Sequence, residues 1–233
     1  MKKLVTLSVI LLAPSMALAQ TAAMDGSRHD LASGVAVSSN ATRICQFCHV
    51  PHNARTDVNG IWNRNNGNDT AYTWGSIAAT TIGGTDLTAG GSEIGASSLR
   101  CFACHDGTVD MGVLYATGDT YTMAGAINGT GGLSNTFYKI DTGSMAGNHP
   151  VSVRYPDTAN PSTDYLGTSS GINATDYKTI ASITLAGNVR LYEDTATNGL
   201  GIECGSCHDP HELANSYFLR VSVDNSALCV NCH

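Results

Sequence analysis

The sequence predicts a mostly irregular, coil-rich chain that folds as a single domain, with a few short helices and a few short strands. Its 233 residues include 25 glycines but only 4 phenylalanines, so large apolar side chains for an ordinary core are scarce. A five-residue pattern recurs four times, and it is the strongest signal for local helical structure. A chain of this kind needs another source of buried apolar material.

The recurring pattern is Cys-x-x-Cys-His, and its four copies contain all 8 cysteines. Two thiols one helical turn apart can bond to the two vinyl groups of a porphyrin, and the following histidine can bind its iron. We therefore expect four covalently bound haem c groups, around which the domain packs. The attachment residues are Cys45, Cys48, Cys101, Cys104, Cys204, Cys207, Cys229 and Cys232, and the proximal iron ligands are His49, His105, His208 and His233.

Two other uses of paired cysteines explain this pattern less well. A zinc ribbon needs two Cys-x-x-Cys pairs, which Cys204/Cys207 and Cys229/Cys232 would supply. A disulfide framework would suit an exported chain. Neither use requires a histidine directly after every pair, and every pair here is followed by one.

The histidine count matches the number of iron positions. Of the 8 histidines, those outside the motifs are His29, His52, His149 and His211. If every iron has two histidine ligands, these four residues are the distal ligands. Such irons keep no open position for a substrate. The sequence therefore predicts an electron-transfer protein rather than an enzyme, with no catalytic residues.

The spacing of two distal candidates limits which iron each can bind. His52 and His211 each follow a motif histidine by three residues, a spacing that puts both rings on one face of a helix or turn. The two axial ligands of a haem approach from opposite sides, so His52 and His211 must each reach another haem and hold two haems close together. We expect His52 at the second haem and His211 at the fourth, which leaves His29 and His149 for the first and third.

The chain divides into a leader and one cofactor-binding domain. Residues 1–19 combine two lysines, a short apolar run and a small-x-small site, which is the pattern of a secretory signal. The run is too short to cross a membrane, so we expect an exported protein without a membrane span. Residues 20–233 form the tetrahaem domain, with haems 1 and 2 bound around 45–105, haems 3 and 4 around 204–233, and a Gly/Thr/Asn-rich wrapping segment at 111–200.

Local signals place short elements at and between the motifs. Ser, Asn and Asp residues precede predicted helices over 41–49, 99–105 and 227–233. A hairpin around a glycine turn is predicted over 180–191, and a strand over 217–223. No internal repeat longer than the five-residue motif is evident.

The charge of the chain narrows its partners. There are 19 Asp and Glu residues against 12 Lys and Arg residues, for a formal net charge of −7. Haem propionates would add to the negative charge. This balance argues against nucleic acid and anionic lipid as partners, and it favours cationic partners or oxidised metal species.

The motifs and their order resemble those of a known family. Three of them continue as Val50-Pro51-His52-Asn53, Asp106-Gly107-Thr108 and Asp209-Pro210-His211, and Asn148-His149-Pro150-Val151 lies between the second and third motifs. This arrangement is similar to that of the doubled-motif multihaem cytochromes of metal-reducing bacteria, in particular their outer-surface tetrahaem members. The resemblance covers the motifs across most of residues 29–233 and not the stretches between them.

The resemblance implies a function for the haem chain. Members of that family polymerise head to tail into extracellular conductive filaments, in which a neighbouring subunit donates one axial histidine. His29 is the candidate donor here, because a segment near the N-terminus is easily lent to a neighbour. The resemblance places the protein at the cell outer surface, with identical subunits, other cytochromes or extracellular metal acceptors as partners. The alternatives are a soluble periplasmic or secreted electron shuttle, and a multihaem oxidoreductase with a displaceable axial ligand.

Overall fold

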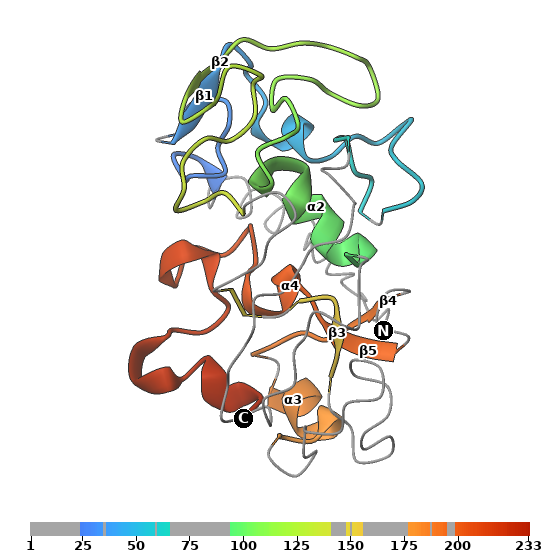
Figure 1. Ribbon diagram of the computed structural model, residues 1–233, viewed down its shortest axis with the longest axis vertical. Helices are drawn as coiled ribbons and strands as arrows, with labels where there is room; N and C mark the ends of the chain where they lie inside the picture. Colours follow the sequence, from blue (N-terminus) through green and yellow to red (C-terminus); the bar gives the residue numbers. More distant parts are fainter. Residues whose placement is uncertain are drawn as a thin grey trace, which may run out of the picture.

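The computed structural model confirms a coil-rich chain with short helices and strands (Figure 1). It describes residues 24–34, 36–58, 60–65, 94–140, 148–149, 151–155, 177–186, 188–194 and 199–233. The predicted signal at 1–19 lies outside these residues. Among the described residues, no helix combines the length and apolar character needed to cross a bilayer.

The upper part of the molecule in Figure 1 contains the first two motifs and a two-stranded sheet. Strand β1 (Val37–Ser39) pairs antiparallel with β2 (Met123–Gly125), so that Val37 faces Gly125 across the ladder. Gly125 has a φ of 104°, and a Cβ there would lie 2.4 Å from the Ala36 carbonyl oxygen, so only glycine fits. A small core lies beneath this sheet and consists of Leu31, Val37, Ala41, Phe47, Met111, Leu114 and Leu133.

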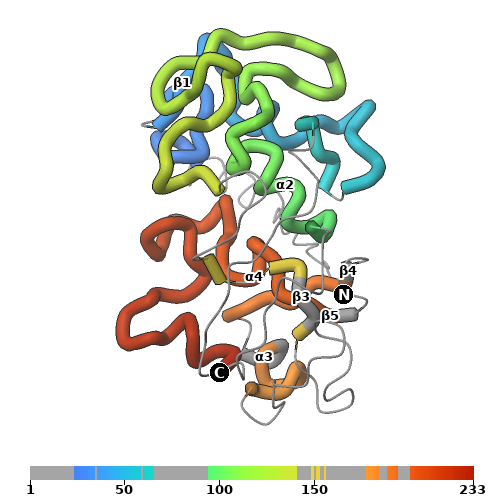
Figure 2. The backbone as a smooth tube through the Cα atoms, in the orientation of Figure 1, coloured from blue at the N-terminus to red at the C-terminus, as the bar shows by residue number. Residues whose placement is uncertain are grey.

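The lower part contains the last two motifs and a second small core. Its sheet has the order β3-β5-β4, all antiparallel, formed by β3 (Val153–Arg154), β5 (Gly199–Ile202) and β4 (Tyr192–Asp194). Helix α3 (Ile180–Ala186) lies next to it, and Tyr155, Ile183, Val189 and Ile202 form the core between them. Figure 2 shows the same division, with the N-terminal chain in blue and green above the C-terminal chain in orange and red.

The four motifs lie on short helical turns, as predicted, two of them α-helical and two of them 3-10. Helix α2 (Ala96–His105) carries the second motif and begins at Ala96, earlier than the predicted 99. The first motif lies on a single 3-10 turn, η1 (Ile44–Phe47), and the third on α4 (Cys204–Cys207). The fourth lies on η6 (Cys229–Asn231), after another 3-10 turn, η5 (Asp224–Ser226).

Two predicted β elements are wrong. The hairpin expected over 180–191 is replaced by α3, because the apolar residues Ile180 and Ile183 share one helical face toward the lower core. The strand expected over 217–223 begins instead with a 3-10 turn, η4 (Ser216–Phe218), and only Leu219 forms a bridge, to His208. Periodicity over such short segments fits either structure.

Candidate haem-binding sites

The histidines of the first three motifs are oriented by backbone carbonyl groups. The Nδ1 atom of His49 donates a hydrogen bond to the Gly60 oxygen at 2.7 Å, and that of His208 donates to the Tyr217 oxygen at 2.9 Å. His105 makes the same contact with the Tyr138 oxygen at 2.5 Å. A carbonyl can only accept, so Nδ1 carries the proton and Nε2 keeps its lone pair. This is the arrangement expected of a histidine that binds a metal through Nε2.

The first and third motifs share the same return of the chain. After His49, the Val50 amide donates to the Ile61 carbonyl at 2.9 Å, and the Asn63 amide donates to the Cys48 carbonyl at 2.9 Å. His49 also forms an isolated antiparallel bridge with Trp62. The imidazole is therefore held between the motif and the returning chain.

The corresponding contacts follow the third motif in the same order. The Asp209 amide donates to the Phe218 carbonyl at 2.8 Å, the Arg220 amide donates to the Cys207 carbonyl at 2.9 Å, and His208 bridges Leu219. Residues 45–63 and 204–220 thus form a repeated turn, which we call the histidine turn. This repeated turn is longer than the five-residue motif, and no repeat of that length is evident in the sequence.

The two histidine turns share an unusual backbone conformation. Both residues that lie across from the histidine have positive φ, 90° at Gly60 and 49° at Ile61 in the first turn, and 58° at Tyr217 and 57° at Phe218 in the third. Left-handed backbone is disfavoured for non-glycine residues, and it persists only where the surroundings enforce it. Here the enforced feature is the carbonyl aimed at Nδ1 of the motif histidine.

Two pairs of histidine rings oppose each other at closely similar distances. The His49 and His211 ring centres are 6.2 Å apart with an interplanar angle of 22°, and those of His29 and His105 are 6.1 Å apart with an angle of 82°. Two imidazoles that share one metal, each with its nitrogen at about 2 Å, have ring centres roughly 6 Å apart. Both pairs therefore fit the space and the donor set of one iron.

The surroundings of His29 keep its imidazole uncharged, as a metal ligand requires. Burial, and then proximity to His105, lower the pKa of its imidazole to about 4, so the ring is neutral and able to bind a metal at neutral pH. Its Nδ1 atom is buried and has no hydrogen-bond partner among the described residues. The ring also stacks on Phe218, with 4.2 Å between ring centres and an angle of 15°. Phe218 thereby joins the third motif's turn to the second site.

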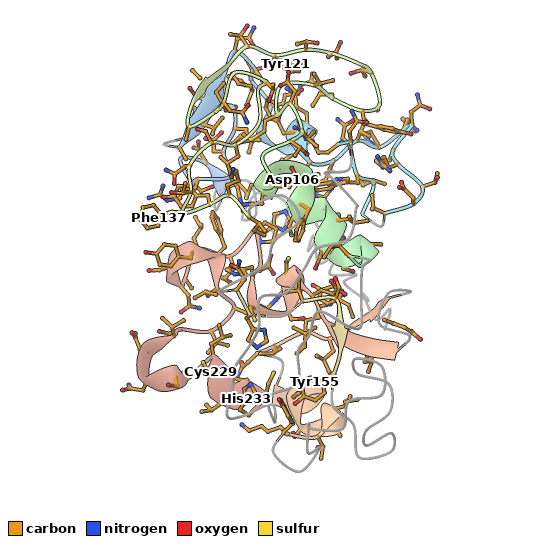
Figure 3. The ribbon with its side chains drawn as sticks, in the orientation of Figure 1. Asp106, Tyr121, Phe137, Tyr155, Cys229 and His233 are labelled. Atoms are coloured by element: carbon orange, nitrogen blue, oxygen red, sulfur yellow. The ribbon has the colours of Figure 1, made fainter. Side chains whose placement is uncertain are left out.

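The fourth motif lies against a different set of residues. Figure 3 shows Cys229, His233 and Tyr155 at the same end of the molecule. Burial, and then proximity to His149, lower the pKa of His233, so these two imidazoles are neighbours. The ring of Tyr177 lies 4.8 Å from that of His233, and the Tyr155 hydroxyl contacts the Cys232 carbonyl at 3.0 Å.

His52 and His208 remain after these three pairs. Both are exposed. Within the described part of the chain, no ring lies against that of His52, and no histidine ring faces His208 at the separation seen in the two opposed pairs. His208 is an electrostatic neighbour of His29 and His105, which places it beside the second site.

The ring pairs differ from those expected from spacing. His211 lies opposite His49 of the first motif and not at the fourth, and His29 lies opposite His105 of the second motif and not at the first. The expectation that His211 cannot share an iron with His208 stays a prediction. The choice among the other three motifs depends on how the upper and lower parts pack, and spacing along the chain carries no information on this.

The attachment cysteines lie next to one another in the order of the motifs. Burial, and then the Cys104 thiol, raise the pKa of Cys48 to about 12. Cys48 of the first site therefore lies near Cys104 of the second site. Cys101 and Cys204 hydrogen-bond to each other and join the second and third sites. Burial, and then the Cys207 thiol, raise the pKa of Cys232 to about 11. Cys207 of the third site therefore lies near Cys232 of the fourth site.

Two residues near the sites were not identified from the sequence: Phe218 stacks on His29, and Asp30 fixes the loop that contains His29. Trp62, which suits packing at a haem as an aromatic residue close to the first motif, lies edge-on against His49 with ring centres 5.9 Å apart. Phe218 and Asp30 each lie outside the motifs and in a segment of ordinary composition. Only the position of Asp30 directly after His29 was available as a signal.

A comparison with known protein families supports haem attachment in the C-terminal part of the chain. A family model described as the doubled CXXCH motif matches residues 198–233, which contain the third and fourth motifs. No curated protein matches the chain. Together, the matched segment and the recurring attachment motif support a multihaem c-type cytochrome with covalently bound haem c, a class of proteins that carries electrons.

Proposed function

We propose that this protein conducts electrons through four haem c groups, each bound by two histidines. When bound, the haems supply a reversible one-electron change between Fe(III) and Fe(II). The observation that carries the proposal is the presence of two histidine pairs, His49/His211 and His29/His105, at the separation that one iron requires. A histidine on each side closes the iron to substrates, so electron transfer is the function that remains.

The neighbouring cysteines support a single path through the molecule. Cys48 lies near Cys104, Cys101 contacts Cys204, and Cys207 lies near Cys232. Since each cysteine is bonded to a porphyrin edge in the loaded protein, these contacts put consecutive haem edges next to each other. The proposed order is therefore first, second, third, fourth, and the polypeptide contributes the spacing and the insulation.

Electrons would enter and leave at the two ends of this path. The attachment cysteines of the first and fourth motifs include the two exposed ones, Cys45 and Cys229, whereas those of the second and third motifs are at least half-buried. The first motif lies in the upper part of the molecule and the fourth in the lower part (Figure 2). A chain of haems with both ends accessible suits transfer between partners on opposite sides.

We further propose that copies of the chain associate head to tail into a filament, and the repeated histidine turn supports this. In the first turn, the ring of His49 is opposed by His211, which is the third residue after His208. The third residue after His49 is His52, so by the same relation His52 would oppose the ring of His208. Both are exposed, so His52 of one copy can complete the iron at His208 of the next. Such a contact is heterologous and extends without closing.

This assignment replaces His29 as the donated ligand. The resemblance pointed to a lendable N-terminal arm, but His29 is buried against His105 and Phe218 of its own chain. Lending it would uncover an aromatic ring and leave the second site incomplete. His52 can be lent without such a loss, because its side chain is exposed.

The expected location and partners follow from the filament. We place the protein at the cell outer surface, with other cytochromes and extracellular metal acceptors as redox partners. The net charge of −7 favours cationic acceptors. A soluble periplasmic or secreted shuttle would use the same four sites without the contact between His52 and His208.

Carbon monoxide separates the conduit from a haem enzyme. The assembled, reduced holoprotein should show no change in its absorption spectrum on addition of carbon monoxide, because every iron keeps two histidines. Binding of one full equivalent per chain by the assembled protein would instead favour a multihaem oxidoreductase, because assembly closes the iron at His208. Electron microscopy of the secreted fraction then separates filament from shuttle, since the shuttle predicts single particles.

A further inference from the structure

A buried carboxylate lies at the junction between the second and third sites. Glu203 directly precedes the third motif, is 0% exposed, and caps the N-terminus of α4 through a reciprocal contact with Ser206. Its Oε2 atom accepts hydrogen bonds from the hydroxyl of Ser98, which lies on α2, and from that of Ser152 at 3.0 Å. Three separate segments therefore converge on one carboxylate.

The hydrogen-bond directions favour the ionised form of the Glu203 carboxylate. The Cys204 amide donates to Ser98 Oγ at 2.9 Å, and the Gly95 amide donates to Ser152 Oγ at 2.8 Å. Each hydroxyl thus accepts from a backbone amide and has its own proton left to donate. Both protons are directed at Oε2, and hydroxyl groups that donate to a carboxylate oxygen favour its ionised form.

This charge acts on the attachment residues of two sites at once. Glu203 is an electrostatic neighbour of both Cys101 and Cys204, whose sulfur atoms contact each other. In the haem-loaded protein, these sulfurs are the thioethers at the facing edges of the second and third porphyrins. Arg100 is the cation that acts on Cys101, but it is only half-buried. A charge in a dry interior acts more strongly than one near water.

We propose that Glu203 sets the reduction potentials of the two inner haems below those of the outer two. In the loaded protein, each inner iron would go from Fe(III) to Fe(II) as a reduced neighbouring haem goes from Fe(II) to Fe(III), and no proton would be required. A buried anion beside the porphyrin edge stabilises Fe(III) relative to Fe(II), so it lowers the potential. This inference rests on the proposed four-haem conduit. It implies that an electron has a higher energy on the two inner haems than on the two outer haems.

The test replaces the charge and keeps the hydrogen-bonding shape. Glu203→Gln holoprotein, with four haems confirmed by intact mass, should show upward shifts of two of its four potentials in a spectroelectrochemical titration and no change in the other two. Glu212→Gln is the matched control, because Glu212 is an exposed carboxylate eight residues after Cys204 that lies in the same part of the chain, and it should shift none. Unchanged potentials, or an equal shift of all four, would overturn the proposal.

If Glu203→Gln fails to load haem, a second measurement on the unmodified protein still tests the proposal. In the unmodified holoprotein, NMR of partly reduced samples gives the order in which the four haems take up electrons. The second and third haems should be reduced last, and reduction of either of them before both outer haems contradicts the role of Glu203. These outcomes are independent of carbon monoxide binding, so a failure here is distinguishable from a failure of the conduit itself.

Discussion

The two histidine turns, residues 45–63 and 204–220, have the same contacts but different surroundings. In both, the motif histidine donates through Nδ1 to a carbonyl of the returning chain, at a distance of 11 residues in the first turn and 9 in the third. The first turn has His211 over its imidazole, at a ring separation of 6.2 Å. The third turn has no such ring among the described residues.

This difference separates two contributions to a haem site. The orientation of the proximal histidine comes from the local hydrogen bonds of the turn, which both copies have. The distal ligand comes from whatever part of the protein packs over the turn. In the first turn the packing is internal. For the third turn our proposal assigns it to another copy of the chain, so assembly performs the role that folding performs elsewhere.

Replacement of His52 tests the open turn and has the largest expected effect. His52→Ala should abolish filaments, because the iron at His208 loses the ligand that joins two copies. Electron microscopy measures the polymers, and the absorption spectrum should show one high-spin iron per chain. Added imidazole should restore the low-spin spectrum without restoring filaments.

The control for this variant is Thr56→Ala, since Thr56 is exposed on the same loop. It should leave both filaments and spectrum unchanged. Normal filaments formed by His52→Ala would remove the proposed equivalence between the two turns.

Replacement of His211 tests the closed turn. His211→Ala should leave the iron at His49 with one ligand, so one of the four irons should become high-spin and bind one equivalent of carbon monoxide. The spectrum should return to low-spin with added imidazole. Leu213→Ala, a change at an exposed neighbour, is the control. A fully low-spin His211→Ala protein would show that another residue opposes His49.

Asp30 determines whether His29 is presented to the second site. Its buried carboxylate accepts from the amides of Gly26, Ala32 and Ser33 and from the Ser33 hydroxyl. Asp30→Ala should cost about 2 kcal/mol in the free energy of unfolding at neutral pH, since buried backbone donors lose a charged acceptor. Denaturant titration measures this, with the exposed Asp25→Ala as the control. Equal stability of Asp30→Ala and the unmodified protein would exclude this role.

The same carboxylate predicts a pH dependence. Burial would raise the pKa of Asp30, but the hydrogen bonds from Ser33, Gly26 and Ala32 outweigh it and hold the pKa below 3.8. A depressed pKa means that the contribution is present at neutral pH and is lost as the pH falls below the ordinary value and through the native one. The stability difference between Asp30→Ala and the unmodified protein should therefore shrink in acid. A difference that stays constant to pH 2 would contradict the assignment.

The smallest effect is expected at Phe218. Its ring stacks on His29 at 4.2 Å, and stacked pairs contribute on the order of 1 kcal/mol. Phe218→Leu should lower stability by about this amount, measured by thermal denaturation, while Tyr217→Leu should not, because Tyr217 is 70% exposed. An equal effect of the two substitutions would mean that the stacking contributes nothing.

The sequence carried the chemistry of the sites better than their arrangement. The attachment motif is a local signal, so all eight cysteines and the helical turn around Cys101 could be located from spacing alone. The ring pairs His49/His211 and His29/His105 could not, since they depend on contacts between residues far apart in the chain. The histidine turn escaped notice because its contacts are made by backbone atoms, and the residues at matching positions, such as Ile61 and Phe218, differ.

The β elements show a different limit. Ile180 and Ile183 fit a strand pattern and a helical face equally well over so few residues, and packing against the lower core selects the helix. Around Phe218, the left-handed backbone that aims a carbonyl at His208 prevents a regular strand. In both places the tertiary contact overrides the local preference.

The most direct test of the shared histidine turn is a cryo-electron microscopy map of the assembled, haem-loaded protein at the iron bound by His208. The account predicts that the second ligand is His52 of a neighbouring copy, while the iron bound by His49 holds His211 of its own chain. An iron at His208 with an open face, or with a second histidine from the same chain, would contradict it.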